Sequence, residues 1–369
     1  MTKRKIINDP VYDGFLSIDD PVILQVIEHP YFQRQRRIKQ LGLTYLVYPG
    51  AMHTRFSHML GALNLMKRAL ETLKLKGVEI TDEECRGAKL AILLHDLGHG
   101  PFSHTSERVL VDVPHEEITL LMMQRINDEM NGALDVAIAI FSNTYPKHFL
   151  HQLVSSQLDM DRLDYLGRDS FFTGVSEGIV GTDRIISMLN VHDDELVIDE
   201  KGIYSVEKFI ISRRLMYWQV YMHKTVIAAD QLLLSILRRA RELNLSPFTF
   251  QLLPFELDRF AEVDDDDIMV AVKHWQHSDD EILSTLCKNL VNRRLPAIRF
   301  NNEPFADVQP SYFEGTGVLH NRSYDFNDQE IKVLYKDGRC LPISEASDQL
   351  DRHFLEKQVT KYYHFYPKR

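Results

Sequence analysis

The feature that most constrains this chain is an apolar helix that ends abruptly in a polar, glycine-rich string. Residues 88–94 carry apolar side chains nearly all round a helical period, which is typical of a helix inside a core. Gly98, Gly100 and Pro101 follow and cannot continue that helix. Polar side chains therefore converge where a core helix stops. The string holds three histidines and an aspartate within ten residues: His95, Asp96, His99 and His104.

Helical patterning also dominates the rest of the first 290 residues. Residues 55–75 repeat apolar side chains at helical spacing, and Gly77 ends the repeat. Thr81 and Glu84 form a capping-box pattern at the start of the core helix. Further helices are expected at residues 19–29, at 31–41, after Pro114, at 206–243 as one long helix or two close ones, and after a second capping box of Ser278 and Glu281.

Strand signals are sparse and gather late in the chain. Residues 195–206 and 331–343 alternate like hairpins around Gly202 and Gly338, and residues 296–300 are a further candidate strand. The acidic run 264–267 is interpreted as a solvated helix N-terminus. We therefore expect a mainly α fold, with a helical domain over residues 1–290 and a small α+β region over residues 291–369.

Composition excludes several classes of protein. The net charge of −10 argues against a protein that coats nucleic acid, although a local phosphate-binding pocket is compatible with it. The longest apolar runs are far shorter than the roughly 20 residues that a bilayer requires. Three widely spaced cysteines and an N-terminus without an apolar signal segment favour a reducing cytoplasm.

The His95–Asp96 pair suits a divalent metal, because a neutral imidazole nitrogen and an anionic oxygen together bind Mg, Mn, Fe, Co, Ni or Zn. Two ligands are too few, and the segments 55–58 and 158–165 can supply others. A single histidine or aspartate in a helical protein is more often a surface or capping residue than a ligand. The residues alone therefore predict a metal and a phosphoester and leave the substrate open.

The chain resembles the HD-domain deoxynucleoside triphosphate triphosphohydrolases, of the type found in the SAM-and-HD-domain protein. The resemblance covers about residues 5–240, and we expect no SAM domain because it starts almost at Met1. The stretches that carry it are Arg36 to Gly42, Tyr48 to Ala51, Arg55 to His58, His95 to His104, His115-Glu116, Asp159 to Asp169 and Tyr221 to Lys224.

The resemblance implies an HD-domain helical core, one divalent metal ion and a reaction at the α-phosphorus that releases deoxynucleoside and triphosphate. The implied metal ligands are His58, His95, Asp96 and Asp161. The implied phosphate contacts are Arg55, His99, His104, Arg162 and Arg213. The implied catalytic relay is His115 and Glu107 with Glu116 behind them, and either His104 or His115 is the general acid. The implied groups around the sugar are Gln40, Leu41, Tyr165, Asp169 and Tyr221.

The same family carries a regulatory nucleotide site that drives assembly of the oligomer. Its motif matches Lys5, Asn8, Gln33 and Arg36 here. Glu28 departs from the family's aspartate, and Ala297 stands where a basic residue is expected. A nucleotide activator and a homodimer or homotetramer are therefore expected only as a hypothesis.

Two alternative functions stay open. One is an HD phosphohydrolase that acts on a nucleoside monophosphate, a cyclic nucleotide or a guanosine alarmone. The other is a nucleotide-binding or nucleic-acid-binding regulator without turnover. Gln40, Asp169 and Tyr221 favour the dNTP substrate over the first alternative, and the intact ligand set argues against the second.

Overall fold

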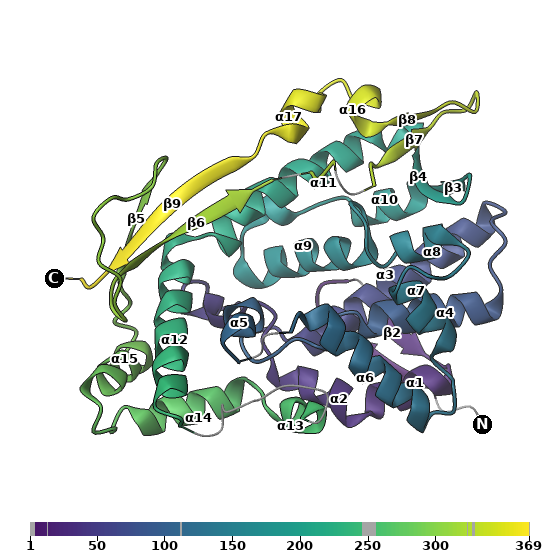
Figure 1. Cartoon of the computed structure of the whole chain (residues 1–369). Coiled ribbons are helices and arrows are strands. Elements are labelled where there is room, and N and C mark those ends of the chain that lie inside the picture. The colour runs from purple at the N-terminus through teal and green to yellow at the C-terminus, as the bar shows by residue number, and fades with distance from the viewer. Residues whose placement is uncertain are drawn as a thin grey trace.

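The computed structural model describes residues 4–12, 14–110, 113–245, 256–322, 324–326 and 329–368, without the side chains of residues 104, 107 and 108. Helices form the body of the molecule, and most of the strands lie together along one side of it (Figure 1). The expectation of a mainly α fold with a small α+β C-terminal region is confirmed. No helix among the described residues is long and apolar enough to cross a membrane.

The helices of the body follow one another with short connections. In chain order they are α1 (Pro21–Glu28), α2 (Pro30–Arg34), α3 (Arg55–Leu75), α4 (Asp82–Leu94), α5 (Glu107–Leu110), α6 (His115–Glu129), α7 (Asp135–Phe141), α8 (His148–Gln152), α9 (Met160–Thr173), α10 (Thr182–Met188), α11 (Ile203–Met216), α12 (Lys224–Glu242), α13 (Leu257–Glu262), α14 (Asp265–Trp275), α15 (Glu281–Val291), α16 (Ile343–Ala346) and α17 (Arg352–Glu356).

The strands form small sheets around this body. They are β1 (Lys5–Asn8), β2 (Phe15–Ile18), β3 (Leu189–His192), β4 (Glu195–Asp199), β5 (Ala297–Asn301), β6 (Gly315–Asn321), β7 (Lys332–Leu334), β8 (Cys340–Pro342) and β9 (Val359–Tyr366). β1 pairs with β2, β3-β4-β7-β8 form a second sheet, and β5-β9-β6 form a third. The division at residue 290 stays a prediction, and the parallel pairing of β4 with β7 joins strands from its two sides.

Several elements agree with what the local sequence signals predicted. α3 spans the residues that its periodicity predicted, and the Thr81–Glu84 capping box opens α4. The hairpin around Gly338 is β7–β8, and the strand near residues 296–300 is β5. The segment 206–243 is two helices, because a π-helical stretch at Tyr217–Tyr221 interrupts it before α12 begins.

Other expectations were wrong. The hairpin expected around Gly202 turns instead at residues 193–194 between β3 and β4, and Gly202 leads directly into α11. The capping residue of α15 is Asp280, which accepts from the Leu283 amide, rather than Ser278. The expected helix at residues 31–41 ends early, as α2 and a 3₁₀ turn at residues 35–37.

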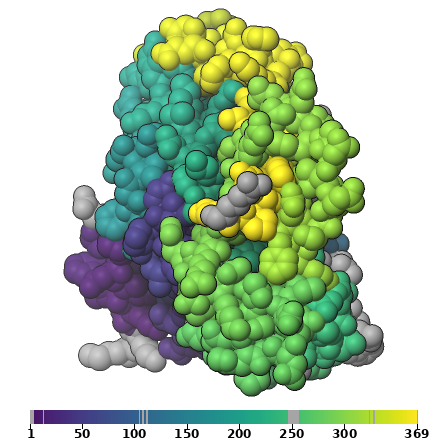
Figure 2. Space-filling model, turned by 90° about the vertical axis from the view of Figure 1, so that its left-hand side faces the viewer, coloured from purple at the N-terminus to yellow at the C-terminus, as the bar shows by residue number. Residues whose placement is uncertain are grey.

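The core gathers α3, α4 and α9 around the end of the apolar helix. All side chains from Leu90 to Leu94 are fully buried, as the apolar pattern predicted. α3 packs against both α4 and α9. The start of α3, the end of α4 and the start of α9 therefore meet. Figure 2 shows the left-hand side of the view in Figure 1. The last third of the chain, green to yellow, covers much of this face, and the N-terminal part, in purple, lies beside it.

Candidate active site

Four acidic and imidazole side chains meet where α3, α4 and α9 converge. His58 lies in the first turn of α3, His95 follows the last residue of α4, and Asp161 lies in the first turn of α9. The Nε2 atoms of His58 and His95 are 3.4 Å apart, and Asp161 Oδ1 lies 3.1 Å and 3.3 Å from them. Asp96 lies next to them, with Oδ1 3.5 Å from His95 Nε2 and Oδ2 3.6 Å from His58 Nε2.

The separations among His58, His95 and Asp161 fit a metal ion that these three residues would bind, and the predicted fourth ligand, Asp96, lies next to them. Metal bonds of about 2.0–2.2 Å to imidazole nitrogen and carboxylate oxygen place neighbouring ligand atoms about 3.0–3.6 Å apart. The atoms of His58, His95 and Asp161 meet this requirement on three different helices. A mixed nitrogen and oxygen set suits a divalent cation, without selecting one.

The opposite ring nitrogen of each histidine is held by an acceptor. His58 Nδ1 lies 2.7 Å from Asp164 Oδ2, and His95 Nδ1 lies 2.7 Å from the carbonyl oxygen of Ile92. Because an acceptor binds a protonated Nδ1, the neutral ring presents an unprotonated Nε2 to the centre. Both rings are thereby fixed in the orientation that metal binding needs.

Charge balance at the centre also favours a cation. Burial opposes protonation of His58, but Asp161 and Asp164 outweigh it and raise the His58 pKa to about 10. Burial would raise the pKa of Asp161, but His95 and His58 hold it well below its usual range. Without a metal, the carboxylates therefore retain protons on the imidazoles. A divalent cation satisfies the same carboxylates and displaces those protons.

Asp96 links this centre to Arg55 and to the loop after α4. The guanidinium of Arg55 is buried, pairs with Asp96 and donates to Ser103 Oγ at 3.0 Å. His99 Nε2 lies 3.4 Å from Asp96 Oδ1. Burial raises the Asp96 pKa, but His95, Arg55 and His99 together hold it well below its usual range. Asp96 is therefore the ionised carboxylate between the metal centre and the cationic loop.

The residues expected to form the catalytic relay lie beside Asp96. The rings of His99 and His115 stack with centroids 3.8 Å apart, and His115 Nε2 lies 3.4 Å from Glu116 Oε1. Glu116 is exposed. The side chains of His104 and Glu107 lie outside the described residues, so their predicted roles stay predictions.

The residues expected around the sugar gather further along α9. Asp169 Oδ1 lies 2.8 Å from His53 Nε2, and Tyr221 donates to Asp169 Oδ2 at 2.6 Å. The rings of Tyr165 and Tyr221 meet edge to face, and burial followed by the charge of Asp169 raises the Tyr221 pKa well above its usual range. His53 is buried and stacks on Phe172. Asp169 is thus a buried carboxylate held from two sides.

The other predicted substrate groups are Arg162, Arg213, Gln40 and Leu41. Arg162 lies on α9, and its guanidinium pairs with Asp159. The guanidinium of Arg213 lies over the ring of Tyr217. The backbone N–H of Gln40 donates to the His53 carbonyl at 3.0 Å, and Leu41 is partly buried and packs against the core. Within the described part of the chain, the buried atoms Gln40 Oε1 and Arg213 Nε have no hydrogen-bond partner. Two such atoms among the predicted substrate contacts are consistent with a polar ligand.

The predicted regulatory residues divide into two groups. Gln33 Oε1 accepts from Arg36 Nε at 2.9 Å, and the Arg36 guanidinium lies 3.5 Å from the ring centroid of Phe56. Glu28 is the last residue of α1, and Lys5 and Asn8 are the two ends of β1. No hydrogen bond between described residues joins Lys5 or Asn8 to the Gln33–Arg36 pair. The second site therefore stays a prediction.

Several residues that support the site had not been singled out in the sequence. Asp265 belongs to the acidic run that was expected to be solvated, yet it is fully buried. It accepts from the amides of Phe102 at 2.7 Å and Lys39 at 2.9 Å, and so ties the loop after α4 to α14. Asp164 and Arg168 do carry a sequence signal, because they lie three and seven residues after Asp161, on one helical face.

Comparison with known proteins places these residues in matched regions. Residues 55–169 match the model of the HD domain, and residues 180–302 match that of the HD associated region. An uncharacterized protein of Bacillus subtilis is 34% identical, over 100% of this chain and 93% of that protein. The crystal structure of a phosphohydrolase from Bacteroides thetaiotaomicron is 46% identical, with a TM-score of 0.94 over 99% of this chain and 100% of that one.

A more distant relative has an assigned activity. The deoxynucleoside triphosphate triphosphohydrolase SAMHD1 homolog of Dictyostelium discoideum is 32% identical over 60% of this chain. The match covers 46% of that relative, so this chain spans less than half of its length.

Proposed function

We propose that this chain, which belongs to the HD-domain phosphohydrolase family, hydrolyses deoxynucleoside triphosphates to deoxynucleoside and triphosphate. The observation that carries the proposal is the order of groups along α9. Asp161 belongs to the metal cluster, Tyr165 follows one turn later, and Asp169 follows after another turn beside Tyr221. A nucleotide lying along this helix would have its phosphates at the metal and its sugar at Asp169.

The chain supplies the groups that a phosphate ester needs. When bound, a divalent metal supplies a Lewis acid for a phosphate oxygen and lowers the pKa of its bound water. Arg55, Arg162 and Arg213 are the cations that would offset the charge of the phosphates. His99 and His115, which group with Asp96 outside the cluster of His58, His95 and Asp161, are the imidazoles that would hold or donate the proton for the departing oxygen.

The sugar side would be read by hydrogen bonds. His53 and Tyr221 orient the Asp169 carboxylate. This carboxylate would accept a hydrogen bond from a 3′-hydroxyl. Gln40 Oε1 offers a second buried acceptor on the same side. A buried acceptor without a partner is costly, so a substrate that lacks the matching hydroxyl would bind weakly.

The test is to resolve the products. Purified protein with Mg²⁺ or Mn²⁺ is incubated separately with each dNTP, each NTP, nucleoside monophosphates, cyclic nucleotides and a guanosine alarmone. We expect deoxynucleoside and intact triphosphate from dNTPs. Orthophosphate or pyrophosphate as the product would instead identify an HD phosphohydrolase of another phosphoester. Tight nucleotide binding without turnover under either metal would identify a regulator.

We further propose that the protein acts in the cytoplasm as a homodimer or homotetramer with a nucleotide activator. The support is the presence of Lys5, Asn8, Gln33 and Arg36 at the motif positions, although Glu28 departs from that motif. Mass photometry with and without GTP or dNTPs tests the proposal. A mass and an activity that no nucleotide changes would contradict it.

A further inference from the structure

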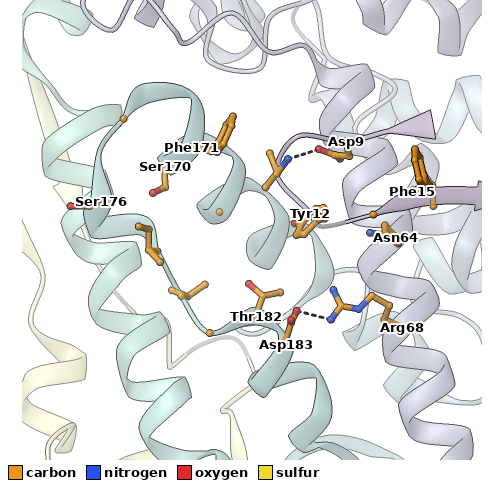
Figure 3. Close-up of a pocket in the computed structure, with 18 residues that line it drawn as sticks. Asp9, Tyr12, Phe15, Asn64, Arg68, Ser170, Phe171, Ser176, Thr182 and Asp183 are labelled. Carbon is orange, nitrogen blue, oxygen red and sulfur yellow. Dashed lines mark hydrogen bonds and ion pairs between the residues drawn. The ribbon is translucent and has the colours of Figure 1, made fainter. Parts of the chain in front are cut away.

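A cavity of about 760 Å³ lies beside the candidate metal centre, on the far side of α9 from the predicted substrate groups. The β1–β2 hairpin, α3, α9 and the segment at residues 174–183 line it (Figure 3). Asp9 and Tyr12, from the hairpin connection, line its wall. Neither residue lies in the HD-domain match at residues 55–169.

Tyr12 contacts the partner of a metal-cluster histidine directly, and Asp9 reaches the same partner through Arg168. Tyr12 donates to Asp164 Oδ1 at 2.7 Å, while Asp164 Oδ2 holds His58 Nδ1 at 2.7 Å. Arg168 donates to Asp164 from Nε at 2.8 Å and Nη2 at 3.0 Å. Its Nη1 and Nη2 reach the two oxygens of Asp9 at 3.2 Å and 2.6 Å.

Burial makes this network sensitive to the loss of any member. The side chains of Asp164 and Arg168 are wholly buried, whereas Asp9 keeps 12% exposure at the cavity wall. A buried guanidinium needs every partner, because an incompletely paired charge in a core is costly. Without Asp9, Arg168 would turn toward other acceptors and release its two bonds to Asp164. Without the Tyr12 hydroxyl, Asp164 would lose the donor that fixes its second oxygen.

We propose that Asp9 and Tyr12 are positioning residues for the metal-cluster residue His58. They act through Arg168 and Asp164, which hold the imidazole so that Nε2 faces Asp161. The N-terminal hairpin is thus a structural part of the metal centre, although it lies about 150 residues from α9 in the sequence. The inference concerns the metal centre and holds for any phosphoester substrate.

The test measures Mn²⁺ affinity of the full chain in the absence of nucleotide, by electron paramagnetic resonance of the free ion. Asp9→Asn and Tyr12→Phe remove one oxygen charge and one hydroxyl with little change of shape. We expect about 3- to 10-fold weaker Mn²⁺ binding in each, somewhat below the effect of losing a direct partner of a ligand. Asp183→Asn is the matched control, because Asp183 pairs with Arg68 on the same cavity wall and touches no member of the network.

Unfolding midpoints and kinetics separate positioning from simple destabilisation. At saturating Mn²⁺ we expect kcat to recover in Asp9→Asn and Tyr12→Phe, with KM close to that of the unchanged protein. Mn²⁺ affinities equal to that of the unchanged protein would overturn the proposal. So would equal losses in Asp183→Asn, or losses that simply follow the fall in melting temperature. Since Mn²⁺ binding is measured without nucleotide, the result can be interpreted even if the protein does not hydrolyse dNTPs.

Discussion

At the scale of single residues, the candidate centre depends on which nitrogen of each imidazole carries a proton. The acceptors Asp164 and Ile92 O direct the protonated Nδ1 away from the cluster in His58 and His95. These acceptors favour the tautomer and the orientation in which both neutral rings present Nε2 toward Asp161. The family resemblance predicts which residues are the ligands, but the orientation of the two rings depends on Asp164 and on the Ile92 carbonyl, which that prediction did not include.

Replacement of His95 or Asp161 by alanine is expected to abolish both bound metal and hydrolysis, because each supplies an atom to a cluster only 3.1–3.4 Å across. Metal content by plasma mass spectrometry and product analysis by chromatography check this. His192→Ala, at a partly exposed histidine of β3 outside the cluster, is the control and should retain both. Full metal content in either variant would refute the ligand assignment.

Asp230 offers a test of pH dependence away from the metal. Burial raises its pKa to about 7, and the bond from Thr105 Oγ1 at 3.0 Å only partly opposes this. Between the unfolded pKa of about 3.9 and pH 7, the folded chain holds more protons than the unfolded one, so wild-type stability falls as pH rises.

Asp230→Asn removes that loss. The variant should gain about 1–3 kcal/mol over the unchanged protein at pH 8, since one pKa unit is about 1.4 kcal/mol and partial exposure reduces the full shift. At pH 4 the gain should vanish. Urea unfolding at both pH values measures it, and a gain that is the same at pH 4 and pH 8 would contradict the assignment.

At the scale of elements, the close approach of α3 to α9 depends on Gly61. A Cβ at this position would lie 2.0 Å from Asp164 Oδ1 and 2.1 Å from Arg168 Nη2. The glycine is therefore needed where α3 crosses the buried ion pair. Helix periodicity predicted α3 correctly, but no periodicity could reveal which position faces this pair.

Gly61→Ala is expected to destabilise the fold by about 1–3 kcal/mol, the usual cost of overpacking a core, and to weaken metal binding by displacing Asp164. Gly167→Ala on α9 is the matched control, because a Cβ there meets no atom within 4 Å. That control should be neutral or slightly stabilising, since alanine is the better helix former. Chemical unfolding and metal titration of both variants decide the matter, and a stable Gly61→Ala with full metal affinity would refute the role of the close contact.

At the scale of the whole molecule, three helices converge on the candidate metal centre, and the connection of the N-terminal hairpin contacts α9 beside it. A ligand that binds the folded chain and not the unfolded one stabilises the fold, by about 2.7 kcal/mol at 100 times its dissociation constant. Distant parts of the chain also meet at this scale, because β7 and β8 complete the sheet that β3 and β4 begin.

Removal of metal is therefore expected to lower the melting temperature by several degrees, and restored Mn²⁺ should reverse the fall. Differential scanning calorimetry before and after chelation measures it. The His95→Ala variant should show no such response, because it lacks the site. A chelation shift of equal size in that variant would mean that the metal acts elsewhere.

Local sequence patterns were enough to predict several helices and the metal-binding residue types at the end of one of them. Apolar spacing gave α3 and α4, the Thr81–Glu84 box gave a helix start, and the string at residues 95–104 gave the metal chemistry. These signals are local, because helical period, capping and chain breaking act within a few residues. Resemblance then supplied the distant partner Asp161.

The residues that surround the candidate metal site could be identified only from the three-dimensional packing. The acidic run at residues 264–267 looked solvated, yet Asp265 is buried against two backbone amides of distant segments. β4 has its antiparallel partner before it in the chain, across the turn at residues 193–194, and its second partner is the remote β7, so no hairpin forms at Gly202. Asp9 and Tyr12 likewise reach α9 only through the fold. Burial and charge pairing between segments far apart in the chain depend on packing, and no local pattern records them.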